Sequence, residues 1–287
     1  MSLSVKVADL ILTAVSLHPS INLKLSDQYL PFLSSDGQTD IAFHFLYAHL
    51  PSFQKARLIF NSQGSYRIYQ HQEKYLIPLG KGDPQRLAAF DLGFTQGEIY
   101  SSPQHFLPSQ SPFDIYLFEH PLDQLALVNY LAPKHGALMH ASGMAVENQG
   151  LLFVGMSGAG KSTIAKIWQA ITAEKLLNDD RIIIRRRHGS LRMYGTPWPG
   201  EAQISSPDSA PLKHIFFLEK APHNSIRPLS PMEAATRLLA CSFPPLYSRD
   251  GMESIIEFFS QVVTEIPCYE LNFVPDRNVV DFILGVM

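Results

Sequence analysis

The sequence has few of the features that mark several common classes of protein. Its only cysteines are Cys241 and Cys268, both in apolar surroundings, so it has neither a disulfide framework nor a paired-cysteine metal motif. The histidines show no zinc-ligand spacing such as H-E-x-x-H. No apolar run is long enough to cross a membrane, and we see no signal peptide. With a net charge of −3, no broad basic field would attract nucleic acid. We therefore expect a cytoplasmic protein that binds neither nucleic acid nor membrane.

The 287 residues suffice for one large domain or two ordinary ones, and a hydrophobic content of 46% allows a substantial core. A proline-rich connection at 103–112 is a plausible boundary. We predict a β-rich N-terminal region over 1–110 and a second domain over 111–287. The first region contains four alternating, strand-like runs at 41–45, 56–60, 66–69 and 74–78.

The most informative segment is an eight-residue stretch that fits the pattern G-x-x-x-x-G-K-[ST]. Its residues are Gly155, Met156, Ser157, Gly158, Ala159, Gly160, Lys161 and Ser162. An apolar run at 151–154 precedes it, and a helical pattern that starts at Thr163 follows it. A strand, a glycine loop and a helix N-terminus together form a binding site for polyphosphates, to which backbone N–H groups and the helix dipole both contribute. We therefore predict that these residues and Thr163 bind ATP or GTP, with Lys161 on the β- and γ-phosphates and Ser162 on Mg²⁺.

The segments around this motif predict a mixed sheet. The runs 144–147 and 151–154 are joined by a short turn, so the strand before the glycine loop should pair antiparallel with its predecessor. A second hairpin is expected over 181–194. A parallel doubly wound domain would have a helix between such strands. Further elements are expected at 113–118 (strand), 122–131 (helix), 215–218 (strand), 231–241 and 251–263 (helices) and 268–273 (strand), with a helix after 275–277.

A helix is expected after the glycine motif, and two adjacent acids, Asp179 and Asp180, follow that helix and lead into a strand. Beside a bound Mg²⁺–nucleotide, one could contact the metal or its waters, and the other could accept a proton from an attacking hydroxyl. Asn178-Asp179-Asp180 is also a common turn composition. His140, in an apolar run upstream, is either a core residue or a group that contacts the reacting phosphoryl; His135 is its weaker rival.

Two further carboxylates are weaker candidates. Glu201 ends the Gly- and Pro-rich segment 195–201, a type of rigid loop that often shapes a site, and it is a candidate Mg²⁺ ligand. Glu219 follows an apolar run, as an acid that binds Mg²⁺ does in many nucleotide-binding proteins, or it simply ends a strand.

From His140 to Arg181 the pattern resembles the HPr kinase/phosphorylase family, whose nucleotide core is like that of phosphoenolpyruvate carboxykinase. The resemblance consists of the histidine, the hairpin, the glycine motif, a helix and the acid pair. It implies an α/β fold with a mixed sheet and a kinase core. It also implies that Asp180 accepts the proton of a serine hydroxyl with Asp179 in support, that His140 lines the phosphoryl group, and that Lys161 binds the phosphates. The family usually has Ser-Glu after the lysine, whereas this chain has Ser162-Thr163, and its metal-binding glycine-rich signature is not recognisable here.

These observations predict an ATP-dependent kinase that transfers the γ-phosphoryl group to a hydroxyl, most plausibly serine, of a protein, a peptide or a small molecule. Two alternatives stay open: a non-catalytic nucleotide-binding sensor or subunit, and a carboxykinase-type reaction on a small acid. A transport ATPase would need an L-S-G-G-Q-type stretch, which the sequence lacks. The acceptor, the preference for ATP over GTP, and assembly into a homo-oligomer are left open.

Overall fold

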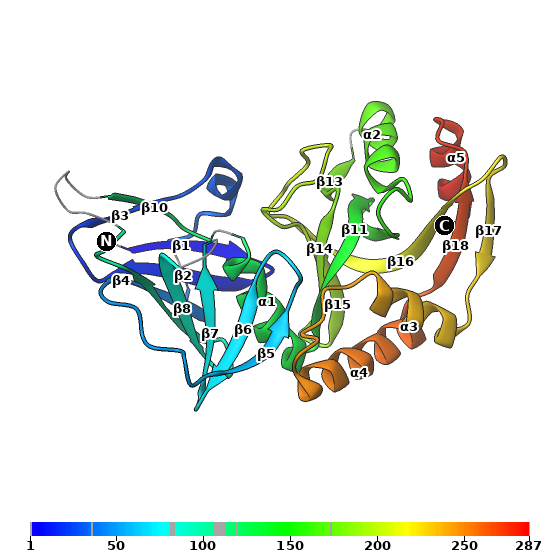
Figure 1. Ribbon diagram of the computed structural model, residues 1–287. Coiled ribbons are helices and arrows are strands. Elements are labelled where there is room, and N and C mark those ends of the chain that lie inside the picture. The colour runs from blue at the N-terminus through cyan, green and yellow to red at the C-terminus, as the bar shows by residue number, and fades with distance from the viewer. Residues whose placement is uncertain are drawn as a thin grey trace. The chain divides into compact units, whose positions relative to one another are not determined.

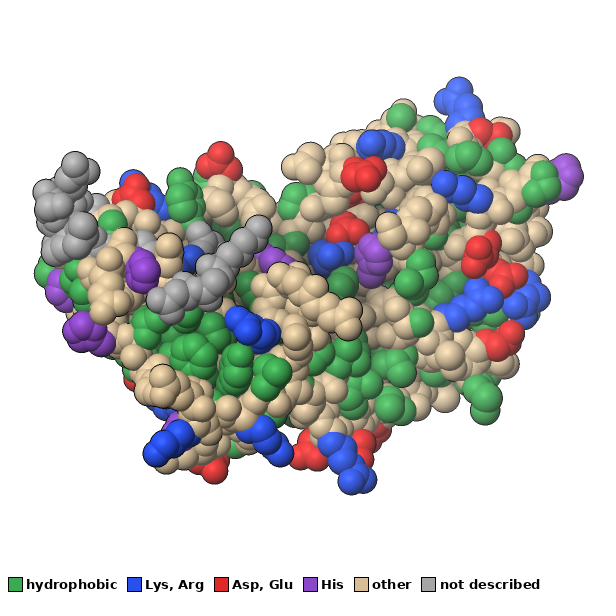
Figure 2. All heavy atoms as spheres, viewed as in Figure 1, with side chains coloured by type: hydrophobic (Ala, Val, Ile, Leu, Met, Phe, Trp, Pro, Cys, Tyr) green, Lys and Arg blue, Asp and Glu red, His purple; other side chains and the backbone are tan. Residues whose placement is uncertain are grey.

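The computed structural model describes residues 2–35, 37–80, 84–105, 113–118, 120–172 and 174–286 (Figure 1). Its contacts divide the chain into two compact units, Met1–Tyr130 and Leu131–Met287. On the face shown in Figure 2, acidic and basic side chains are interspersed over both units, without a large patch of one sign. Among the described residues, no helix has the length and apolar character needed to cross a membrane.

The N-terminal unit is built on an eight-stranded mixed sheet with the order β1-β2-β4-β9-β8-β7-β6-β5. Most neighbours are antiparallel, but β4 pairs in parallel with both β2 and β9. The strands are β1 (Ser2–Val7), β2 (Leu10–Ser16), β4 (Ile41–Tyr47), β5 (Arg57–Asn61), β6 (Arg67–His71), β7 (Lys74–Leu79), β8 (Arg86–Asp91) and β9 (Gln96–Ser101). The four strands predicted from alternation correspond to β4–β7, whereas β1, β2, β8 and β9 were not predicted.

The contacts place the unit boundary later than the sequence does. Strand β10 (Phe113–Tyr116) pairs in parallel with β3 (Ile21–Lys24), which ties residues beyond 110 to the first unit. Helix α1 (Leu122–Leu131), whose bounds match the prediction, lies mostly in this unit, and its Tyr130 hydroxyl donates to Asp40 at 2.9 Å. A short 3-10 helix, η1 (Asp27–Phe32), completes the unit. Residues 106–112, which hold most of the predicted connection, lie outside the described residues.

In the C-terminal unit, two long strands connect two halves of a mixed sheet. Strand β11 (Gly136–Val146) pairs with β14 (Arg181–Arg187) through its first half and with β12 (Gln149–Val154) through its second half. Strand β16 (Ser209–Lys220) pairs antiparallel with β15 (Ser190–Tyr194) and then in parallel with β12. The remaining strands are β13 (Lys175–Asn178), β17 (Ser225–Pro228) and β18 (Cys268–Phe273), and a 3-10 turn, η2 (Ala132–Lys134), precedes β11. Both predicted hairpins and the mixed sheet are confirmed, whereas β13 and β17 were not predicted.

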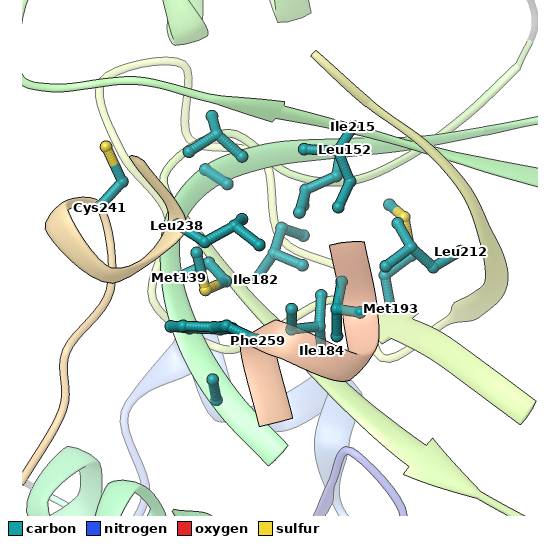
Figure 3. Packing of buried hydrophobic residues seen from close by; sticks show 14 of the residues in the cluster. Met139, Leu152, Ile182, Ile184, Met193, Leu212, Ile215, Leu238, Cys241 and Phe259 are labelled. Atoms are coloured by element: carbon teal, nitrogen blue, oxygen red, sulfur yellow. The ribbon is translucent and has the colours of Figure 1, made fainter. Parts of the chain in front are cut away.

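Helices cover both faces of this sheet (Figure 1). Along β12, Leu151 and Phe153 pack in one apolar cluster with α2 (Lys161–Ile171) and α5 (Asn278–Leu284). Leu152 and Val154 point the other way, into a cluster with α3 (Pro231–Ala240) and α4 (Arg249–Glu265), part of which is shown in Figure 3. Because strand side chains alternate between faces, an uninterrupted apolar run is what a strand buried on both sides requires. This packing holds the end of β12 rigidly in the middle of the sheet.

Candidate functional site

The glycine loop, residues 155–160, connects the end of β12 to the start of α2 at Lys161. Gly160 has a φ of +107°, which side chains rarely allow, and a Cβ there would lie 2.6 Å from the Phe273 ring. At Gly155, a Cβ would lie 2.6 Å from the Cβ of Ala159. The loop therefore needs glycine at both positions to turn this tightly in front of the helix.

Lys161 folds back across the mouth of this loop. Its side chain is largely buried, and its Nζ donates to the carbonyl oxygens of Gly155 at 2.9 Å and Met156 at 3.0 Å. Burial lowers the pKa of Lys161, and the nearby Asp180 carboxylate and Cys241 thiol oppose part of that effect. A phosphate could replace the two carbonyls as the partner of the ammonium group, and the predicted role of Lys161 in binding phosphates stays a prediction.

Asp179 is fully buried and organises the loop after β15. Its Oδ1 accepts hydrogen bonds from the backbone N–H groups of Gly200 (2.8 Å) and Ile204 (3.2 Å). Its Oδ2 accepts from the N–H of Ala202 at 2.8 Å and from the Ser162 hydroxyl at 3.2 Å. Both oxygens are thus occupied, and Asp179 connects the residue after Lys161 to the loop that carries Glu201.

Asp180 has surroundings different from those of Asp179, because Asp180 lines the polar side of the loop whereas Asp179 is fully buried. Its Oδ1 lies 3.0 Å from Nε2 of His140, and its Oδ2 pairs with the guanidinium group of Arg181. Burial alone would raise the pKa of Asp180, but the hydrogen bond from His140 and the charges of Arg181 and Lys161 together lower it below the ordinary value of 3.8. Asp180 is therefore ionised at neutral pH.

Asn178 holds the acid pair and the Gly- and Pro-rich loop together. Its Oδ1 accepts from the N–H groups of Asp180 and Arg181, both at 2.8 Å, and its Nδ2 donates to the carbonyl of Thr196 at 2.9 Å. The turn that we weighed as an alternative at Asn178-Asp179-Asp180 is therefore present, and it presents both acids. Sequence reasoning assigned no role to Asn178.

These elements surround a polar cavity of about 500 Å³. It brings together several predicted site residues: His140, Ser157, Gly158, Gly160, Lys161, Ser162, Thr163, Asp180 and Glu201. Asp179 lies behind it, fully buried, whereas Gly155, Met156 and Ala159 line a neighbouring cavity. Lys220 and Gly200 also line the polar cavity and were missed. Lys220 ends β16, the parallel neighbour of β12, so strand order places it beside the glycine loop.

A magnesium ion would find few protein ligands here. Among the described residues, no group of three or more His, Cys, Asp or Glu side chains could hold a metal. Mg²⁺ commonly uses only one or two protein oxygens, with waters and substrate phosphates as its other ligands. The Ser162 hydroxyl and the exposed Glu201 carboxylate line one cavity and fit that description.

Comparison with known proteins identifies the family. The model of the family described as SynChlorMet cassette protein ScmC matches residues 114–274, more than half of the chain, and this protein belongs to that family. The match includes the glycine loop, the acid pair and the loop that carries Glu201. No curated protein matches the sequence.

Among solved structures, the Hpr(Ser) kinase/phosphatase from Coxiella burnetii matches with 15% sequence identity and a TM-score of 0.29. The match covers 51% of this chain and 85% of that one. A TM-score this low does not establish a common fold, so the resemblance drawn from the motifs stays a prediction.

Proposed function

We propose that this protein is an ATP-dependent kinase that transfers the γ-phosphoryl group to a hydroxyl acceptor. The observation that carries the proposal is the convergence of Lys161, Ser162 and the His140–Asp180 pair on one polar cavity at the N-terminus of α2. A glycine loop ahead of a helix N-terminus suits a polyphosphate. In addition to nucleotide binding, phosphoryl transfer needs groups that orient the acceptor and accept its proton, and the acid pair supplies such groups. A cytoplasmic location is part of this proposal.

In this proposal, binding and orientation are divided among the loop residues. The N–H groups of the glycine loop and α2 hold the phosphates, and Lys161 exchanges its carbonyl partners for the β- and γ-phosphates. Ser162 and Glu201 hold Mg²⁺, which neutralises charge on the phosphates when bound. Asp179 is a positioning residue, because its oxygens already accept hydrogen bonds from the backbone of the loop and from the Ser162 hydroxyl.

Asp180 is the group that receives the acceptor's proton. Its lowered pKa makes it a weak base early in the reaction. That is compatible with phosphoryl transfer, in which the transition state is largely dissociative and little proton transfer is needed before the phosphoryl group moves. His140 holds the carboxylate in place through its 3.0 Å contact and lies beside the reacting group.

Two substitutions test the proposal. Lys161→Ala removes a charge-assisted contact worth about 1.5–3 kcal/mol, so affinity for a fluorescent ATP analogue should fall roughly 10–150-fold and transfer should stop. Asp180→Asn should leave that affinity unchanged and reduce the transfer rate by about 10²–10⁴-fold. Full turnover in Asp180→Asn would show that the assignment of the base is wrong.

A non-catalytic sensor or subunit is the second candidate, and it is favoured because the metal-binding glycine-rich signature of the kinase family is not recognisable in this chain. Rapid mixing of excess enzyme with γ-labelled ATP and Mg²⁺ separates the two candidates. With a hydroxyl acceptor such as L-serine or a serine-containing peptide in the mixture, a labelled acceptor within one turnover supports the kinase. Tight binding of ATP without any labelled product supports the sensor.

A further inference from the structure

A second cavity, of about 450 Å³, lies on the other side of the glycine loop. We name it the side cavity. Its walls are residues 154–159, the end of β16 over 217–220, and the end of α3, where Arg237, Ala240 and the C-cap residue Cys241 line the cavity. It shares Ser157, Gly158 and Lys220 with the polar cavity, so the two cavities meet at the loop. The proposed function uses only the polar cavity.

The hydrogen bonds of Lys161 indicate which end of a phosphate chain would face the side cavity. Its ammonium group contacts the carbonyls of Gly155 and Met156, which line the side cavity and not the polar one. A lysine in this motif reaches the β- and γ-phosphates. The terminal phosphate should therefore lie at the boundary with the side cavity. The backbone N–H of His140, which lines the polar cavity, donates to the carbonyl of Cys241, which lines the side cavity, at 2.8 Å, so the two cavities also adjoin there.

The side cavity combines an apolar wall with two cations, Arg237 and Lys220, and one anion, Glu219. The Arg237 guanidinium is held by Glu270 at 2.6 Å and lies 5.8 Å from the centre of the Phe217 ring, and its remaining N–H groups can serve a ligand. Glu219 supplies an exposed carboxylate. Met156 and Cys241, whose sulfur atoms are 3.8 Å apart, add apolar surface. Cys241 lies at the margin of the core cluster, where α3 ends (Figure 3).

We infer that the side cavity binds the phosphoryl acceptor, and that the acceptor is a small hydroxyl-bearing amino acid. Arg237 binds its carboxylate, Glu219 its ammonium group, and the apolar wall its carbon chain. This inference rests on the proposed function. In the reaction, the acceptor oxygen bonds to the γ-phosphorus as the bond from that phosphorus to the β–γ bridging oxygen breaks. ADP leaves, and the hydroxyl proton passes to Asp180.

The volume supports a small acceptor. Pockets for small molecules commonly measure about 300–1,000 Å³ and combine an apolar lining with a few polar groups. The side cavity, at about 450 Å³, is at the lower end of that range.

The test fills the side cavity and leaves the polar one unchanged. Ala240 lines the side cavity and is exposed, so Ala240→Leu adds bulk there at little cost in folding. Thr236→Leu is the matched control, because Thr236 is an exposed residue of the same helix outside the cavity. Glu219→Gln removes only the charge proposed to bind the ammonium group. Each variant is assayed for binding of a fluorescent ATP analogue and for transfer from γ-labelled ATP to L-serine, L-threonine and L-tyrosine.

We expect the wild type to phosphorylate at least one of the three amino acids. Ala240→Leu should raise the KM for that acceptor by at least about tenfold, Glu219→Gln should raise it by a similar factor, and Thr236→Leu should behave as wild type. Affinity for the ATP analogue should stay within about twofold in all three variants. Transfer to a serine-containing peptide but to no free amino acid would overturn the inference and leave the kinase standing. So would normal kinetics in Ala240→Leu. No binding of the ATP analogue to the wild type would overturn the proposed function as well.

Discussion

Replacing Asp179 with asparagine should destabilise the C-terminal unit strongly, because the carboxylate accepts four hydrogen bonds in a fully buried position. Asparagine has nearly the same shape, but one of its two terminal atoms is a donor. Whichever way the amide turns, two of the four donors then face another donor. Each buried donor left unsatisfied costs about 1–3 kcal/mol, so the free energy of unfolding should fall by about 2–6 kcal/mol.

Tryptophan fluorescence makes this change measurable for the C-terminal unit alone. Trp168 and Trp198 are the only tryptophans of the chain, and both are buried in that unit. With a urea dependence of about 2 kcal/mol per molar, the unfolding midpoint should fall by about 1–3 M. Asp180→Asn is the control. The Asp180 side chain retains 26% exposure, so water can form hydrogen bonds with the groups that lose their partner. The midpoint of this variant should move by no more than about 0.5 M, which corresponds to about 1 kcal/mol.

Substitution of the two neighbouring acids should therefore have different effects. Asp179→Asn should lower the free energy of unfolding, whereas Asp180→Asn should lower the transfer rate. If Asp179→Asn unfolds at the wild-type midpoint, the buried carboxylate does not hold the loop over 200–204 and the reasoning is refuted. The same holds if Asp180→Asn loses as much stability as Asp179→Asn.

Three further predictions follow from the same geometry. In Gly200→Ala, the new methyl group would lie 2.7 Å from both Asp179 Oδ2 and Asp180 Cβ, so turnover should fall at least about tenfold, and unchanged steady-state kinetics would contradict this. Because the folded-state pKa of Asp180 is lowered, its contribution to stability is present above the unfolded pKa of about 3.9 and disappears as pH falls through the folded value. The stability gap between wild type and Asp180→Asn should thus be largest near pH 6 and shrink as the pH falls below about 4; a gap that widens on acidification would contradict this. Burial raises the pKa of Cys268 to about 12, so iodoacetamide at pH 8 should label Cys268 only after unfolding in urea, and mass spectrometry of the native protein would reveal any earlier labelling.

Much of the C-terminal unit could be predicted from local patterns. The two hairpins, α3 with its Ser230–Glu233 capping box, and the strand before the glycine loop all carry signals within a few residues, and the structure contains each of them. Strands β13 and β17 were missed because each is short and neither alternates clearly: β13 has two adjacent leucines, and β17 ends at a proline. The boundary near residue 110 could not be corrected from the sequence, because the pairing of β10 with β3 joins segments about ninety residues apart.

The amino-acid sequence by itself determined the turn and the helix N-terminus at 155–162, since both depend on glycines and on neighbours in the chain, and these are the residues that we propose to bind phosphate. It also placed two acids close behind them. Only the tertiary structure decided the different surroundings and partners of these two acids. Asp179 became a buried anchor because the loop over 200–204 folds onto it, and Asp180 became the partly exposed partner of His140 because β11 and β14 pair at that register. Contacts between distant segments also brought Lys220 and Arg237 to the two sides of the glycine loop, for which no local pattern exists.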